Sequence, residues 1–108
     1  MEEFIDDKMI TKSVKSQRDL LYLNYMPNSL QKLESHLNKV KEKNKIWKIR
    51  NTVVNIEAYQ CKLENIKIIN LFSKLQDLNI GANPHLTSLA GIEHCHNLKY
   101  INCSDCDL

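Results

Sequence analysis

The sequence predicts an α/β repeat solenoid, in which short strands alternate with 3₁₀ or irregular turns. The first observation is that four segments of the chain recur with a period of roughly 22–23 residues, which is in the range of solenoid proteins. The second is that apolar and polar residues alternate within each segment, as in a short strand with one buried face. Because so short a unit can bury its apolar edge only against its neighbours, the period predicts a stack of units.

Four columns of equivalent positions define this period. The columns are Leu30, Val53, Leu75 and Leu98; Leu33, Ile56, Leu78 and Ile101; Ser35, Ala58, Ile80 and Cys103; and Asn38, Cys61, Asn83 and Cys106. The fourth column falls where the chain leaves the strand, and an inward asparagine there can hydrogen-bond backbone groups that the turn leaves unpaired. Cysteine is small and a weak donor, so it can occupy the same position.

A second pattern lies between the predicted strands. The apolar residues Leu63, Ile66, Ile69 and Leu75 are spaced by three, three and six, and Leu86, Leu89, Ile92 and Leu98 repeat this spacing. The segment from Leu89 to Ile92 is too short for a long helix, which indicates 3₁₀ or irregular turns on the convex side.

The shared motif is L-x-x-L-x-(small or apolar)-x-x-(N or C), and its clearest copy runs from Leu75 to Asn83. In this motif the chain resembles the leucine-rich repeat family, in the short-repeat form of phosphatase regulators and bacterial internalins. The resemblance implies repeats at about 30–52, 53–74, 75–97 and 98–108, the last incomplete, after an N-terminal cap segment at 1–29. It also implies that the strands form a short parallel sheet on the concave face of the solenoid, after an N-terminal helical cap. The expected function is that of a non-catalytic module that binds another protein through this concave β-face.

The first repeat has an alternative interpretation. Leu30, Leu33 and Leu37 also stand at helical spacing, so the segment from Ser29 to Asn44 could be an amphipathic capping helix. The residues of this segment align with those of the second repeat at a constant offset of one period, which favours a repeat instead. Within the cap segment we expect helix from about Ser13 to Met26.

The outward positions of the predicted strands are the candidate binding residues. They are Glu34, His36, Asn55, Glu57, Tyr59, Asp77, Asn79, Tyr100, Asn102 and Ser104. Tyr59 and Tyr100 are the best anchors, because tyrosine buries a large area, freezes few rotamers and keeps a polar tip. The alternative is that these side chains only solvate the strand face.

A histidine and cysteine cluster near the C-terminus suggests a second alternative, a small zinc-stabilised module. Its ligands would be Cys95, Cys103, Cys106 and one of His94 or His96. The column positions of Cys103 and Cys106 favour core packing over metal binding, so we expect no metal and no other cofactor. No motif positions a pair of groups for acid–base or nucleophilic chemistry, which argues against an enzyme.

Charge and hydropathy bear on partners and location. The net charge is +2, and the basic run Lys39, Lys41, Lys43, Lys45, Lys48 and Arg50 lacks interleaved stacking aromatics, so a nucleic-acid partner is not favoured. No apolar stretch approaches the roughly 20 residues of a membrane span. The acidic start lacks the pattern of a signal peptide, which predicts an intracellular, cytoplasmic protein.

The last repeat is cut at Leu108 and has no polar capping unit after it. Such an end would expose apolar side chains of the last strand. Two further expectations follow. The chain could be an N-terminal structural fragment of a longer repeat protein with no binding role of its own, or this end could mediate end-to-end self-association.

Overall fold

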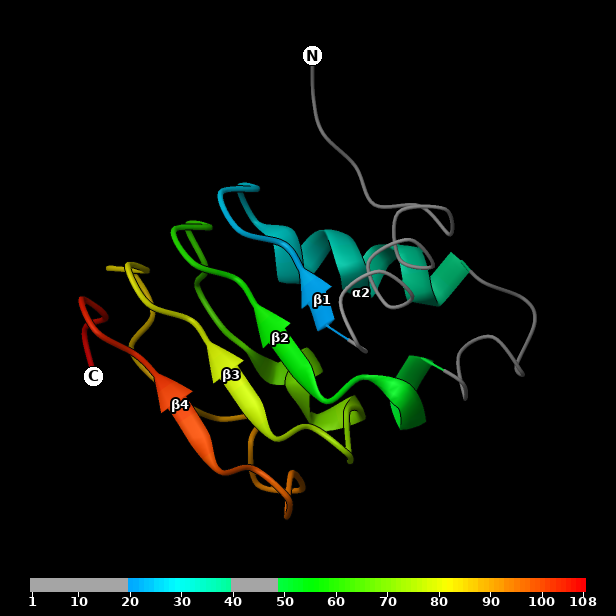
Figure 1. The fold of residues 1–108 in the computed structure, drawn as a ribbon. Coiled ribbons are helices and arrows are strands. Elements are labelled where there is room, and N and C mark those ends of the chain that lie inside the picture. The colour runs from blue at the N-terminus through cyan, green and yellow to red at the C-terminus, as the bar shows by residue number, and fades with distance from the viewer. Residues whose placement is uncertain (1–19, 40–48) are drawn as a thin grey trace.

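The computed structural model describes residues 20–39 and 49–108 and contains a four-stranded parallel sheet in the order β1-β2-β3-β4 (Figure 1). The strands are β1 (Leu20–Tyr22), β2 (Asn55–Glu57), β3 (Asp77–Asn79) and β4 (Tyr100–Asn102). Helix α2 spans Ser29–Lys39, the 3₁₀ helix η1 spans Lys67–Leu71, and residues 49–52 are also helical. The described residues therefore form a small α/β structure, and the expected parallel sheet is confirmed.

One residue of each strand points into the core. These are Leu21, Ile56, Leu78 and Ile101, which stand in register across the sheet. The first three are buried, whereas Ile101 in the edge strand β4 is half-buried. The predicted inward positions of β2, β3 and β4 are therefore confirmed, and Leu21 is their counterpart in β1.

The chain leaves each strand in the same way. The N–H of Leu23, Ala58 and Ile80 donates to the carbonyl of Glu57, Asn79 and Asn102, respectively, over 2.7–2.8 Å. Shortly after each strand, one residue has a positive backbone φ. These residues lie two positions after Leu23, Ala58, Ile80 and Cys103, and they are Tyr25, Gln60, Ala82 and Asp105. This shared left-handed residue turns the chain out of the plane of the sheet at the carboxyl end of every strand.

The segments that return behind the sheet also match one another. The N–H groups of Ile69, Phe72 and Leu75 donate to the carbonyls three positions earlier, over 3.0–3.1 Å. The same three bonds recur one period later, at Ile92, Cys95 and Leu98. Bonds of this reach are typical of 3₁₀ geometry, which is confirmed as η1 in the first of these segments.

The core lies between the sheet and these returning segments, and α2 and η1 lie on that same side of the sheet (Figure 1). The largest fully buried side chain is Phe72, which follows η1 and joins the leucine and isoleucine residues of the strands in one core. No helix in the described ranges is long and apolar enough to cross a membrane.

The expected first repeat was wrong in its placement. Residues Ser29–Lys39 form helix α2, which buries Leu30, Leu33 and Leu37. Its i, i+3, i+7 pattern is that of an amphipathic helix, and the spacing of three between the first two leucines also fits the strand motif. The first strand is instead β1, in a stretch that we expected to be helical. Expectations about residues 1–19 and 40–48 lie outside the described residues.

Gly91 lies in a turn of the returning segments where the backbone approaches closely. Its φ is 127°, and an added Cβ would overlap the Ile66 carbonyl oxygen and lie 2.9 Å from the Lys67 Cα. The Gly91 N–H also donates to the Glu93 carboxylate over 2.8 Å. Hydrogen bonds from the backbone at Glu93 and at Gly91 lower the pKa of that exposed carboxyl.

We expect Gly91→Ala to lower the free energy of unfolding by about 2 to 3 kcal/mol, because the clash is with backbone and the φ is strained for any L-residue. The matched control is Gly81→Ala, whose Cβ would meet only side-chain atoms, at 3.2 Å, that can shift. Urea unfolding of both variants checks this. Equal losses in the two variants would contradict the assigned backbone contact.

Candidate protein-binding face

The side of the sheet opposite α2 and η1 carries three rows of outward side chains, which we call the open face. The first row is Leu20, Asn55, Asp77 and Tyr100, and the second is Tyr22, Glu57, Asn79 and Asn102. The third row follows the strand ends and consists of Asn24, Tyr59, Gly81 and Ser104. No described helix lies over this side of the sheet, whereas the other side holds the core (Figure 1).

Eight of the ten predicted binding residues lie on this face as expected. They are Asn55, Glu57, Tyr59, Asp77, Asn79, Tyr100, Asn102 and Ser104. The placement of Glu34 and His36 was wrong, because both belong to α2 on the far side of the sheet. Their positions in the rows are taken by Tyr22 and Asn24 from β1 and the turn after it.

The missed strand had a signal in the sequence. Leu21, Leu23 and Met26 precede Ile56, Ala58 and Cys61 by one constant offset, and all six are buried. This offset is longer than the repeat period because α2 lies in between. Strand β1 therefore lies outside the period that β2, β3 and β4 share.

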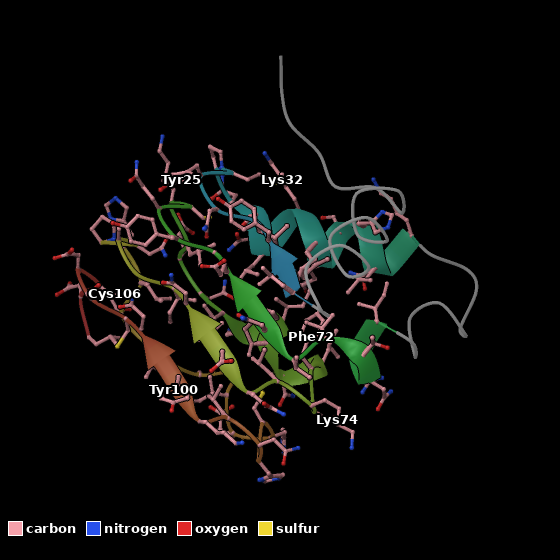
Figure 2. The ribbon with its side chains drawn as sticks, viewed as in Figure 1. Tyr25, Lys32, Phe72, Lys74, Tyr100 and Cys106 are labelled. Carbon is pink, nitrogen blue, oxygen red and sulfur yellow. The ribbon has the colours of Figure 1, made fainter. Side chains whose placement is uncertain are left out.

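Exposed tyrosines stand at both edges of the open face. Tyr22 in β1 is 45% exposed and Tyr100 in β4 is 71% exposed. At the turn after β1, the rings of Tyr25 and Tyr59 meet edge to face, with centroids 5.9 Å apart. Figure 2 shows Tyr25 and Tyr100 at opposite edges of the sheet, so aromatic surface brackets the polar centre.

The third row is held in place by its neighbours. The Tyr59 N–H donates to the Asn24 side chain over 2.7 Å. Gly81 leaves room for the Tyr59 ring, since a Cβ there would lie 3.2 Å from the ring and equally close to the Asn102 and Ser104 side chains. Tyr59 is therefore held in one position, and a side chain that is already ordered loses little entropy in any contact it makes.

The two asparagines in the centre of the face each stabilise their own turn. Asn79 Oδ1 accepts from the Gly81 N–H, and Asn102 Oδ1 accepts from the Ser104 N–H, both over 3.1 Å. Asparagine commonly caps a turn in this way. Because these bonds use only the oxygen, each side-chain NH₂ group keeps its own capacity to donate.

Beneath the open face, the asparagine column behaves as predicted. Asn83 is fully buried, and its Oδ1 accepts from the N–H groups of Cys61 and Leu63 over 2.9 and 3.1 Å. Its Nδ2 lies within 3.0 Å of the carbonyl oxygens of Ala58, Ile80 and Gly81. These bonds fix the carboxyl ends of β2 and β3 and so the third row of the face.

The cysteines of this column reproduce part of that arrangement. Cys61 Sγ donates to the Leu23 carbonyl over 3.0 Å, and Cys106 Sγ donates to the Ile80 carbonyl over 3.1 Å. Leu23, Ala58 and Ile80 are equivalent positions that directly follow β1, β2 and β3, so each column residue bonds the carbonyl at the end of the preceding strand. This agrees with the core role expected for Cys61 and Cys106.

The candidate ligands of the alternative, zinc-stabilised module do not converge. The Cys95 Sγ lies 3.4 Å from the Ile69 carbonyl oxygen and 3.6 Å from that of Phe72, within the returning segments. In the described parts of the chain, no three His, Cys, Asp or Glu side chains come together in a way that could hold a metal ion. The rings of His94 and His96, with centroids 6.5 Å apart, contact each other edge to face.

The four cysteines are free thiols of unequal exposure, which predicts a graded reactivity. Cys61 and Cys95 are buried, and burial, followed by the negative charge of Glu93, raises the pKa of the Cys95 thiol. Because the thiolate is the reactive form, we expect a disulfide reagent at pH 8 to label half-buried Cys103 and Cys106 first. Mass spectrometry of a time course would show this, and early labelling of Cys95 would contradict its placement.

No protein-family model, no curated protein and no solved structure matches the chain. The candidate function therefore rests on the geometry of the open face and on the sequence motif.

Proposed function

We propose that the chain is a non-catalytic module of the leucine-rich repeat type that binds another protein through the open face. The observation that supports this most directly is the contrast between the two sides of the sheet. One side is filled by the core, α2 and η1, whereas the other presents ordered polar rows with exposed tyrosines at their edges. Tyrosine is enriched at protein interfaces for its large, amphipathic ring.

The repeat assignment is supported by recurrence rather than by any one residue. The strand-end bonds, the positive φ after each strand and the bonds of the returning segments all recur at the repeat period from β2 onward. In this proposal β1, α2 and the residues up to Val53 form a longer first unit. The four free thiols fit the intracellular location that the sequence predicts.

A displayed library of random peptides tests the proposal without a known partner. We expect the wild-type chain to enrich a peptide consensus and Asn79→Arg, which places a long charged side chain in the centre of the open face, to lose it. The matched control is Asn65→Arg outside this face, since Asn65 Oδ1 also caps a turn by accepting from the Lys67 N–H, over 3.1 Å. No consensus, or equal loss in both variants, would overturn the proposal.

The edge strand β4 favours a second candidate, a structural role in which a further unit stacks on this edge. Ile101, Cys103 and Cys106 are half-buried, whereas the equivalent residues of β2 are fully buried, and Leu108 is 57% exposed. The stacked unit would be a following repeat or, in end-to-end self-association, a second copy. If the chain self-associates in this way, sedimentation velocity would detect a dimer, and Ile101→Arg would dissociate it. A monomer at all concentrations would exclude end-to-end self-association.

A further inference from the structure

Two pairs of residues on the open face combine a carboxylate with an exposed tyrosine. Tyr22 of β1 is the register partner of Glu57 in β2, and Tyr100 of β4 is the register partner of Asp77 in β3. Register partners on adjacent strands lie about 4.8 Å apart, so each acidic residue stands next to a tyrosine on the same side of the sheet. A carboxylate beside an aromatic face suits a cationic side chain, through an ion pair and a cation–π contact.

The two pairs are related by a diagonal step across the sheet. Asp77 is the register partner of Asn55, two positions before Glu57 on the adjacent strand. A strand spacing of about 4.8 Å and a two-residue rise of about 6.6 Å place the two carboxylate residues about 8 Å apart. Alternate side chains of an extended peptide, which share one side, are about 6.6 to 6.8 Å apart. The flexible arms of arginine or lysine cover the difference.

The charge of this surface has one sign. The eight outward strand positions include Glu57 and Asp77 but no Lys, Arg or His, although the chain as a whole has a net charge of +2. The nearest basic residue in sequence is Lys99, which precedes β4. The centre of the face is therefore complementary to a basic partner and unfavourable to an acidic one.

We infer that the open face binds an extended partner segment with two basic residues at alternate positions, one at Tyr22 and Glu57 and the other at Asp77 and Tyr100. This inference rests on the proposed protein-binding function and names the chemistry of the partner. Asn79 and Asn102 stand two positions after Asp77 and Tyr100 on the same side of the sheet, and in this inference their NH₂ groups donate to the backbone carbonyls of the bound segment.

Synthetic peptides test this with the full chain. The probe is a short peptide of threonine and valine with arginine at two alternate positions, and its counterpart carries glutamate there. We expect calorimetry at low salt to detect only the arginine peptide, and its affinity to fall as salt rises, because exposed charges are screened. Detection of the glutamate peptide at equal or higher affinity would overturn the inference.

Matched variants locate the contact. Glu57→Gln combined with Asp77→Asn should weaken binding of the arginine peptide about fivefold to tenfold, as expected for two partly exposed ion pairs. The control, Glu64→Gln with Asp107→Asn, makes the same change in net charge outside the open face and should shift the affinity less than about twofold. Tyr100→Ala should cost about threefold, while Tyr100→Phe, which keeps the ring face, should cost little. Equal effects of the two double variants would overturn the inference.

The peptide-display experiment distinguishes this inference from the proposed protein-binding function on which it rests. A consensus that is lost in Asn79→Arg but contains no basic residues would leave the protein-binding proposal standing and overturn the basic partner. The chain itself carries lysine at alternate positions 39, 41, 43 and 45. The chain could therefore bind itself. If the chain forms a dimer and the double variant Glu57→Gln with Asp77→Asn dissociates it, the partner is a second copy of this chain and not a separate protein.

Discussion

Leu78→Asp is expected to unfold the protein. Leu78 is the inward residue of β3 and only 2% exposed, between Ile56 and Ile101 in the register of the sheet. Losing a buried leucine costs about 2 to 5 kcal/mol, and an unpaired buried carboxylate costs more. The sum approaches the whole stability of a small domain, about 5 to 15 kcal/mol. We expect the circular dichroism of the variant at neutral pH to show no cooperative thermal transition.

The neighbouring residue provides the control. Asn79→Asp introduces the same side chain one position later, where it points outward and can still accept the Gly81 N–H. We expect the free energy of unfolding to change by less than about 1 kcal/mol, as for most surface substitutions. Similar losses at the two positions would contradict the alternation of inward and outward residues on which the open face depends.

The strands β2, β3 and β4 could be predicted from the sequence because each rests on a local pattern. Ile56, Leu78 and Ile101 recur at the repeat period, and the alternation around them assigns every neighbour to one side of the sheet. A shift by one residue would turn all of these side chains over, so the pattern allows one register only. Eight of the ten predicted face residues depend on these three strands and were placed correctly.

The first unit could not be predicted in the same way. Leu30 and Leu33 satisfy both the strand motif and the first turn of a helix, and Leu37 then completes a helical face that the strand motif does not use. In addition, the longer offset between β1 and β2 breaks the period on which the alignment relied. The tyrosine next to Glu57 was missed for this reason, since only the register of the folded sheet brings Tyr22 beside it.

Asn83→Ala is expected to lower the free energy of unfolding by about 3 to 4 kcal/mol, because two N–H groups in a buried site lose their side-chain acceptor. The Asn83 Oδ1 accepts from Cys61 and Leu63, and a buried, unpaired donor costs about 1 to 3 kcal/mol. In the preceding unit, where Cys61 takes the place of Asn83, the two equivalent N–H groups are those of Met26 and Asn28. Both have backbone acceptors, because the Met26 N–H donates to the Leu23 carbonyl and the Asn28 N–H donates to the Cys61 carbonyl.

Cysteine therefore suffices at position 61, where only a donor is needed, but should not suffice at position 83. We expect Asn83→Cys to recover about 1 kcal/mol of the loss, through a thiol bond to the Ala58 carbonyl like that of Cys61 to Leu23. Urea denaturation would measure both variants, and hydrogen exchange would show faster exchange of the Cys61 and Leu63 amides. If Asn83→Cys proved as stable as the wild type, the acceptor role of Asn83 would be wrong, and packing alone would account for the asparagine column.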